Sequence, residues 1–163
     1  MAMTWDQGLD FEKTLKKLLR DYNEETNLRR KTKLAILITQ LRNGSRISEA
    51  IEAISLFKST GERELAVKVR KKRGKEEFRK MIIPEQIKAN HIVEIPSKEA
   101  VIMFAKRRYD FNTHSLRYAF ISYLAKRGVS PQIIAKITRH SKLDMILNYT
   151  QEKIADEILI KLP

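Results

Sequence analysis

The sequence predicts a mainly α-helical domain with a small antiparallel β-sheet, an α+β fold class. Apolar residues recur at helical spacing through most of the chain, and one basic stretch in the middle alternates apolar and polar residues before a glycine. With 163 residues, 42% of them hydrophobic, the chain is long enough for one domain with a real core and too short for two of usual size. We therefore expect residues 1–163 to form a single domain.

Three helices are expected in the first third of the chain. The first covers Leu9 to Tyr22, where apolar residues fall on one helical face. The second lies within residues 23–44 and ends near Gly44, a residue type common at helix C-termini. The third lies within residues 45–61. Leu34, Leu37, Ile38 and Leu41 form the expected buried stripe of the second helix, and Gly61 ends the third.

A β-hairpin is expected over residues 65–84. "AVKVR" alternates apolar and polar residues, "MIIP" is rich in β-branched residues, and the turn-like "KKRGKE" lies between them with Gly74 at the turn. A further short strand is predicted at residues 91–96, "HIVEIP".

Helices resume in the second half of the chain, over residues 97–110, 112–128 and 130–140. Pro131 suits the first helical position because its missing N–H needs no partner there. "SKLD" at residues 141–144 is a capping box that opens another helix, and residues 152–163 are amphipathic. The N-cap candidates are Ser97, Asn112 or Thr113, and Ser130.

The charge of the chain favours a polyanionic partner. Thirty-three Lys and Arg against twenty Asp and Glu give a net charge of +13, and nucleic acid is the leading candidate. A basic surface without a nucleic-acid partner is the alternative. No apolar run approaches the roughly 20 residues that span a bilayer, and the N-terminus has no secretory signal pattern. We expect a cytoplasmic, DNA-associated protein of a host cell, with no membrane partner.

Five polar residues stand at suggestive spacings. His114 and Arg117 are neighbours on one helical face, because residues i and i+3 lie side by side. Arg46 begins the third helix, His140 directly precedes the capping box, and Tyr149 follows His140 by nine positions. Each has a plain structural reading: Tyr149 as a core aromatic residue, for example, or Arg46 in an ordinary surface ion pair.

Taken in order, these motifs resemble the catalytic domain of the tyrosine recombinases, also called the phage-integrase family. The resemblance runs from about Leu34 to Thr150 and looks closest to integrases of archaeal viruses and plasmids. Its parts are a G-x-R-x-x-E segment, an H-x-L-R segment, and a histidine nine positions before a tyrosine. The matching residues are Gly44, Arg46 and Glu49; His114, Leu116 and Arg117; and His140 with Tyr149.

The resemblance implies a tyrosine recombinase catalytic-domain fold and DNA recombination, including viral genome integration, through a covalent 3′-phosphotyrosyl intermediate. Tyr149 would be the nucleophile, and the guanidiniums of Arg46 and Arg117 would bind the phosphate oxygens. A lysine of the hairpin turn would protonate the leaving 5′ oxygen. Lys75 is the preferred acid and Lys72 the alternative.

The remaining site residues would assist. His114 and His140 would donate hydrogen bonds to the phosphate or help to move the tyrosine proton, and Glu49 would orient Arg46. The resemblance implies neither a metal nor a nucleotide cofactor. Contacts to double-stranded DNA are expected from Lys71, Lys72, Arg73, Arg79 and Arg139.

The chain also departs from the family pattern. Arg139 stands where relatives often have glycine, and Tyr118 where a histidine often follows the second arginine. The N-terminal core-binding domain of relatives is expected to be absent, which makes this an excised or shortened catalytic domain. By resemblance, a homotetramer forms on synapsed DNA, with a monomer or weak dimer in its absence. Residues 150–163 would pack on a neighbouring protomer or on their own domain.

Two other functions compete with recombination. One is a non-catalytic DNA-binding module, because two helices joined around Gly128 are similar to a helix-turn-helix. The other is a type IB topoisomerase-like DNA relaxase, which shares the chemistry but not strand exchange.

Overall fold

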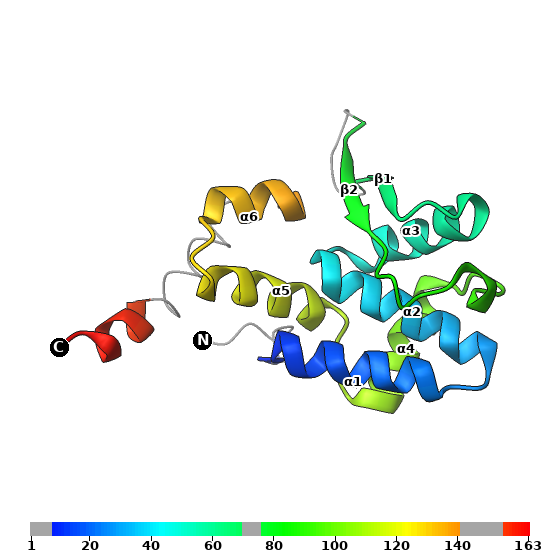
Figure 1. Ribbon diagram of the computed structural model, residues 1–163, viewed down its shortest axis with the longest axis horizontal. Helices are drawn as coiled ribbons and strands as arrows, with labels where there is room; N and C mark the ends of the chain where they lie inside the picture. Colours follow the sequence, from blue (N-terminus) through cyan, green and yellow to red (C-terminus); the bar gives the residue numbers. More distant parts are fainter. Residues whose placement is uncertain (1–7, 70–75, 141–154) are drawn as a thin grey trace.

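The computed structural model describes residues 8–69, 76–140 and 155–163 (Figure 1). It confirms the predicted fold class, mainly helical with a two-stranded antiparallel sheet. Helical turns also cover residues 155–161. The labelled elements are α1 (Phe11–Glu24), α2 (Leu28–Asn43), α3 (Ile47–Thr60), β1 (Glu64–Lys68), β2 (Phe78–Ile82), the short 3₁₀ helix η1 (Ala89–His91), α4 (Lys98–Tyr109), α5 (His114–Lys126) and α6 (Pro131–Thr138).

The core is built around α2. Its segment Leu34–Leu41 is buried on every side, because a helix that is mainly apolar around its circumference needs partners all round. α1, α3, α4 and α5 supply those partners. Gly44 ends α2 in the left-handed region with φ 58°, and a Cβ there would collide with the ring of Phe120. Glycine therefore lets the chain turn sharply from α2 into α3 against α5.

The two paired strands of the predicted hairpin are confirmed, and its expected turn at Gly74 lies outside the described residues. β1 and β2 pair so that Leu65 faces Met81 and Val67 faces Arg79, and these four side chains are buried. Asn43 at the end of α2 fixes the hairpin to the core. Its side-chain amide donates to the Ile82 carbonyl at 2.9 Å and its Oδ1 accepts the Ile82 amide at 2.8 Å.

The strand predicted at residues 91–96 is wrong. This segment forms the end of η1 and an extended connection to α4. Its backbone groups bond side chains of the helices beneath it instead of a neighbouring strand: the Val93 amide donates to Thr32 Oγ1 at 3.1 Å, and the Val93 carbonyl accepts from Lys58 Nζ at 2.9 Å. Local β propensity was therefore outweighed by these tertiary partners.

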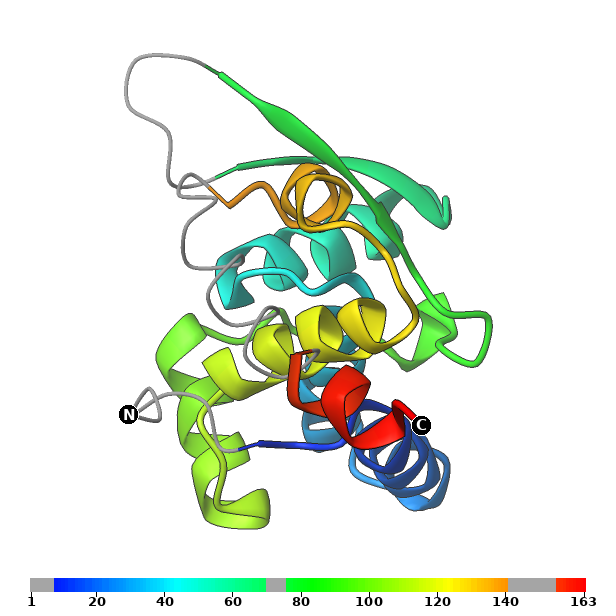
Figure 2. The same ribbon diagram turned by 90° about the vertical axis from the view of Figure 1, so that its left-hand side faces the viewer.

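α5 and α6 form a second, smaller packing unit. Tyr118, Ile121 and Ala125 of α5 pack against Ile134 of α6. α6 also contacts β2, so it lies between α5 and the hairpin (Figures 1 and 2). The end of α6 is thereby brought close to the α2–α3 turn. Within the described residues, no helix combines the length and the apolar character needed to cross a membrane.

Candidate active site

The first predicted arginine is held at the α2–α3 turn. Arg46 directly precedes α3, and its Nη1 contacts Glu49 Oε2 at 2.9 Å. The Arg46 backbone amide also donates to Glu49 Oε1, at 3.2 Å. The Glu49 carboxylate is fully buried, while 15% of the Arg46 side chain is exposed. One carboxylate thus fixes both the main chain and the guanidinium of Arg46, leaving part of that guanidinium open to a ligand.

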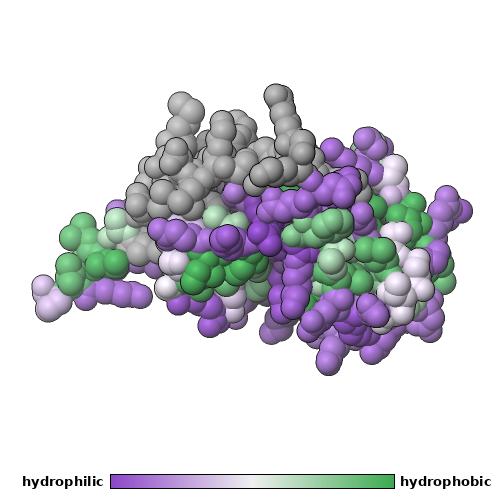
Figure 3. All heavy atoms as spheres, turned by 90° about the horizontal axis from the view of Figure 1, so that it is seen from above, coloured by the Kyte–Doolittle hydropathy of each residue, from purple (hydrophilic) through white to green (hydrophobic). Residues whose placement is uncertain are grey.

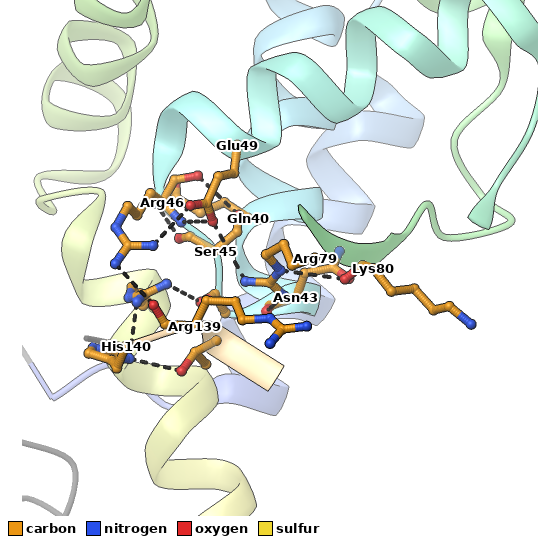
Figure 4. A network of polar contacts seen from close by, with 12 residues as sticks. Gln40, Asn43, Ser45, Arg46, Glu49, Arg79, Lys80, Arg139 and His140 are labelled. Carbon is orange, nitrogen blue, oxygen red and sulfur yellow. Dashed lines mark hydrogen bonds and ion pairs between the residues drawn. The ribbon is translucent and has the colours of Figure 1, made fainter. Parts of the chain in front are cut away.

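The second predicted arginine lies in the first turn of α5 and reaches the same loop. Arg117 is buried, its Nη1 donates to the Gly44 carbonyl at 2.9 Å, and its Nη2 lies 3.0 Å from Nδ1 of His140. Arg46 Nη2 in turn contacts the carbonyl of Arg139 at 3.4 Å (Figure 4). Arg46 and Arg117 therefore both contact the residue pair 139–140 just after α6. Three motifs far apart in the sequence converge at one place.

A buried glutamine links the loops that carry these arginines. Gln40 Nε2 donates to the Ser45 carbonyl at 3.2 Å and to the Thr113 carbonyl at 3.1 Å. It therefore ties the turn before Arg46 to the start of α5. This role of Gln40 is not among those predicted from the sequence. The available signal was a polar residue inside the apolar run 34–41.

His114 begins α5 and is exposed. Together with Arg46 it lines an open groove of about 500 Å³ between α3, α4 and the start of α5. Lys98 and Lys106 line the same groove, together with the apolar side chains of Ile102 and Phe111, so it combines cationic and apolar walls. Such a groove is suited to an anionic ligand.

The burial of Arg79 does not favour the expected DNA contact, which stays a prediction. Arg79 lies on the inward face of β2 and is 2% exposed, so it neither faces water nor reaches a phosphate on the surface. Its Nη2 donates to the Asn43 carbonyl at 2.6 Å, and its Nη1 lies 3.7 Å from Glu49 Oε1 (Figure 4). The strand alternation that faces Val67 and Met81 inward does the same to Arg79.

Arg139 follows α6 in the left-handed region, with φ 57°. A residue with a Cβ is strained there by about 1–2 kcal/mol. Its Nη1 pairs with Glu77 Oε1 at 3.2 Å, which joins the end of α6 to the residue just before β2, at the turn end of the hairpin strands. The side chain is 31% exposed, so the structure leaves the predicted DNA contact of Arg139 untested.

Positive charge predominates in the cluster, because the guanidiniums of Arg46, Arg79 and Arg117 surround the single carboxylate of Glu49. The pKa of Arg117 is lowered to about 9, mainly by burial and next by the nearby charge of Arg46, whereas Glu49 acts to raise it. Burial likewise lowers the pKa of Arg79 to about 10, again with Glu49 opposing the shift. Glu49 is therefore the counter-charge that keeps these buried guanidiniums protonated.

Several predicted site residues lie outside the described residues. They are Lys71, Lys72, Arg73, Lys75 and Tyr149. These residues belong to two segments, 70–75 and 141–154. The described chain flanks the first with Val69, whose amide donates to the Glu77 carbonyl at 2.8 Å, and it ends before the second at His140. Among the described residues, no three His, Asp or Glu side chains gather as a metal-binding group.

Comparison with known proteins identifies the family. No protein-family model matches the chain. A protein of Acidianus two-tailed virus, named "Putative integrase ORF241", is 45% identical over 169 residues, which cover 98% of this chain and 69% of the relative. A protein of Sputnik virophage, "Putative integrase V10", is 31% identical and covers 97% of this chain and 90% of the relative. The chain belongs to the integrase family.

The solved structures show that this integrase has the fold of a tyrosine recombinase catalytic domain. The XerH site-specific recombinase bound to a palindromic difH substrate, in its post-cleavage complex, superposes with a TM-score of 0.64 at 13% identity, over 95% of this chain. The pre-cleavage complex of XerH with difH gives 0.61 at 15% identity. The integrase spans about half the length of these structures, 53% and 52%. The predicted family and catalytic-domain fold are confirmed.

Arg139 departs from the family pattern described above, which leads one to expect glycine at this position. The backbone there is left-handed, and glycine adopts that conformation without strain. In this integrase an arginine takes the strained position, and its contacts to Glu77 and Arg46 offset the cost.

Proposed function

We propose that this chain is the catalytic domain of a site-specific DNA recombinase that cleaves and rejoins DNA through Tyr149, without metal or ATP. The observation that carries the proposal is the meeting of Arg46, Arg117 and His140 from three separate elements. It is supported by the 3.0 Å contact between Arg117 and His140 and the 3.4 Å contact between Arg46 and the Arg139 carbonyl. A cationic cluster with one partly open guanidinium is suited to a DNA phosphate.

In the proposed reaction, the phenolic oxygen of Tyr149 attacks phosphorus and displaces the 5′ oxygen of the next nucleotide. The leaving oxygen takes a proton from Lys75, or from Lys72 as the alternative, and the phenol proton passes to His114 or to water. Arg46, Arg117 and His140 donate to the phosphate oxygens, where negative charge gathers in the transition state. Reversal of the same steps rejoins the strand. The phosphotyrosyl ester conserves the bond energy, so no nucleotide is consumed.

Substitution of the nucleophile tests the proposal. Wild-type protein is expected to form a covalent protein–DNA adduct on suicide substrates that lose a short fragment after cleavage. Tyr149→Phe should form none and still bind the same duplex, because only the attacking oxygen is removed. Adduct is measured on denaturing gels and binding by mobility shift.

Other outcomes would decide against the proposal. An adduct that persists in Tyr149→Phe would move the nucleophile to another residue. Duplex binding by the wild type with no adduct would favour the non-catalytic DNA-binding module. Relaxation of supercoiled plasmid without exchange between two sites would favour the type IB topoisomerase-like relaxase.

Double-stranded DNA is the proposed partner, inside a host cell. The net charge of +13 supports it, and Lys71, Lys72, Arg73 and Arg139 are the proposed phosphate contacts. Each such contact should add about 0.9 to the slope of log affinity against log salt. We further propose a homotetramer on two synapsed DNA sites, with a monomer or weak dimer free of DNA.

The C-terminal segment is proposed to pack on a neighbouring protomer. Its apolar residues are exposed in the single chain, with Leu159 at 71% and Ile160 at 81%. Figure 3 shows hydrophobic residues gathered at this end of the molecule. Ile158 and Leu162 extend the same exposed set. Apolar side chains in such a run favour burial against a protein partner.

Leu159→Ser with Ile160→Ser should raise the protein concentration needed for synaptic assembly at least about tenfold, because burial of one leucine is worth about 1.5–3 kcal/mol. The thermal stability of the free protein should change little, since both side chains are already in water. Lys161→Ala, in the same turn, is the control and should assemble normally. Unchanged assembly by the double variant would contradict the packing of this segment on a neighbouring protomer.

A further inference from the structure

The imidazole of His140 has two polar neighbours on one nitrogen. Nδ1 lies 3.0 Å from Arg117 Nη2 and 2.8 Å from Thr138 Oγ1 (Figure 4). A guanidinium has only donors, so its contact requires a lone pair on Nδ1. A neutral imidazole with a free lone pair on Nδ1 carries its proton on Nε2. The Arg117 contact thus determines the tautomer of His140.

Thr138 is placed to favour the same tautomer of His140. It is the last residue of α6 and is completely buried. Its hydroxyl proton has two acceptors within 2.8 Å, the Ile134 carbonyl and His140 Nδ1. In an α-helix the carbonyl of residue i also accepts the amide of residue i+4. The hydroxyl can therefore turn to Nδ1 without leaving the Ile134 carbonyl unpaired.

We propose that Thr138 is a positioning residue that keeps the proton of His140 on Nε2, where it can be donated to a phosphate oxygen. This inference rests on the proposed function. In that reaction the Nη2 of Arg117 turns to the phosphate and releases Nδ1. Thr138 is buried and anchored by its helix, so it stays in place, and its hydroxyl proton can turn from the Ile134 carbonyl to Nδ1.

The consequence of losing the hydroxyl follows from the tautomers. Once Arg117 engages the phosphate, an unoccupied Nδ1 competes with Nε2 for the single proton. The Nδ1–H tautomer would present a lone pair to the phosphate, which is repulsive, and the transition state would lose a donor. Affinity for DNA depends on many phosphate contacts and should change little.

Two variants separate the hydroxyl from the shape of the side chain. Thr138→Val keeps the branched shape and removes the oxygen, whereas Thr138→Ser keeps the oxygen and removes a methyl group. In single-turnover cleavage of a suicide substrate at saturating protein, Thr138→Val should be about five- to tenfold slower than wild type. Thr138→Ser should recover most of that loss, and the DNA dissociation constants of the three proteins should agree within about twofold.

Nitrogen-15 NMR of labelled histidine reads the tautomer directly. The chain has three histidines, and His140→Gln identifies the signals of His140. In free wild-type protein, Nδ1 should be unprotonated and Nε2 protonated. In DNA complexes made with Tyr149→Phe to prevent cleavage, adding Thr138→Val should shift His140 toward the Nδ1–H form, and adding Thr138→Ser should not.

The outcomes distinguish this inference from the proposed function. A wild-type protein that forms no adduct contradicts the proposed function, and the tautomer of His140 in DNA complexes of Tyr149→Phe, with and without Thr138→Val, still tests the inference. A protonated Nδ1 in the free wild-type protein would overturn the role of Thr138. So would wild-type cleavage by Thr138→Val, or equal losses in the Val and Ser variants, which would indicate packing alone.

Discussion

Replacing the buried carboxylate at the centre of the cluster, Glu49→Gln, is expected to lower the free energy of unfolding by about 3–5 kcal/mol. Glu49 is fully buried and contacts Arg46 at 2.9 Å and Arg79 at 3.7 Å. Glutamine has the same shape but no charge. The substitution would therefore leave buried guanidiniums without their counter-charge, which costs far more than the loss of a surface ion pair.

The same variant should show an altered pH dependence of stability. The native pKa of Arg117, about 9, and of Arg79, about 10, lie below the ordinary value of 12.5. As pH rises through this range, the folded chain releases these protons before the unfolded chain does, so stability increases with pH. Loss of Glu49 lowers both native pKa values further. The loss of unfolding free energy caused by Glu49→Gln should therefore be largest near pH 7 and smaller at pH 10.

Urea unfolding of matched variants at both pH values measures this effect. Glu64→Gln is the control, because it removes the same charge from an exposed pair: Glu64 lies 3.6 Å from Lys80 Nζ, and both side chains are 72% exposed. Its effect should stay below about 1 kcal/mol. If Glu49→Gln were no more destabilising than Glu64→Gln, Glu49 would not be the structural counter-charge of the cluster.

The helices were predictable because their signals are local. Ser97 and Ser130 cap α4 and α6 through their side chains, as their sequence positions predict. At α5 the cap candidates act differently from a simple N-cap: Thr113 makes no side-chain cap bond, and Asn112 Oδ1 accepts the His114 amide at 3.0 Å. Short-range patterns therefore located the helices but not every bond at their ends.

The sequence is least informative where distant segments decide the outcome. Residues 91–96 have strand-like composition, yet their backbone partners come from α2 and α3. In the sequence, Arg79 is one of several basic residues of the hairpin. Nothing near it shows that its side chain faces inward and pairs with Glu49 of α3. A buried charge is predictable only together with its partner, and that partner is known once the chain is folded.

The meeting of Arg46, Arg117 and His140 was predicted from ordered motifs and not from spacing alone. The i, i+3 relation placed His114 and Arg117 near each other, but Arg117 is buried while His114 is exposed. Two of the contacts that hold the site together are made to main-chain carbonyls, those of Gly44 and Arg139. Main-chain groups are common to every residue, so residue types do not reveal such contacts. The roles of Lys75 and Tyr149 stay predictions.

The conservative substitution Arg117→Lys should slow adduct formation by about 10²–10³-fold while DNA affinity changes only a few-fold. Lysine keeps the charge but has one short, flexible ammonium group in place of a planar fork. It cannot reach the Gly44 carbonyl and the neighbourhood of His140 Nδ1 at once, as the two Nη atoms of Arg117 do. The phosphate would then meet a cation that is present but wrongly placed.

Single-turnover cleavage and equilibrium binding separate these effects. Arg127→Lys is the matched control: it is the same substitution at the other end of α5, where the side chain is 58% exposed and lies 3.8 Å from Glu12. Its cleavage rate should stay within about twofold of wild type. Both variants conserve the charge. A cleavage rate that falls in Arg117→Lys but not in Arg127→Lys would therefore assign the effect to the geometry of the Arg117 guanidinium. If Arg117→Lys cleaved at the wild-type rate, a positive charge alone would suffice at this position, and the proposed two-point placement of Arg117 would be wrong.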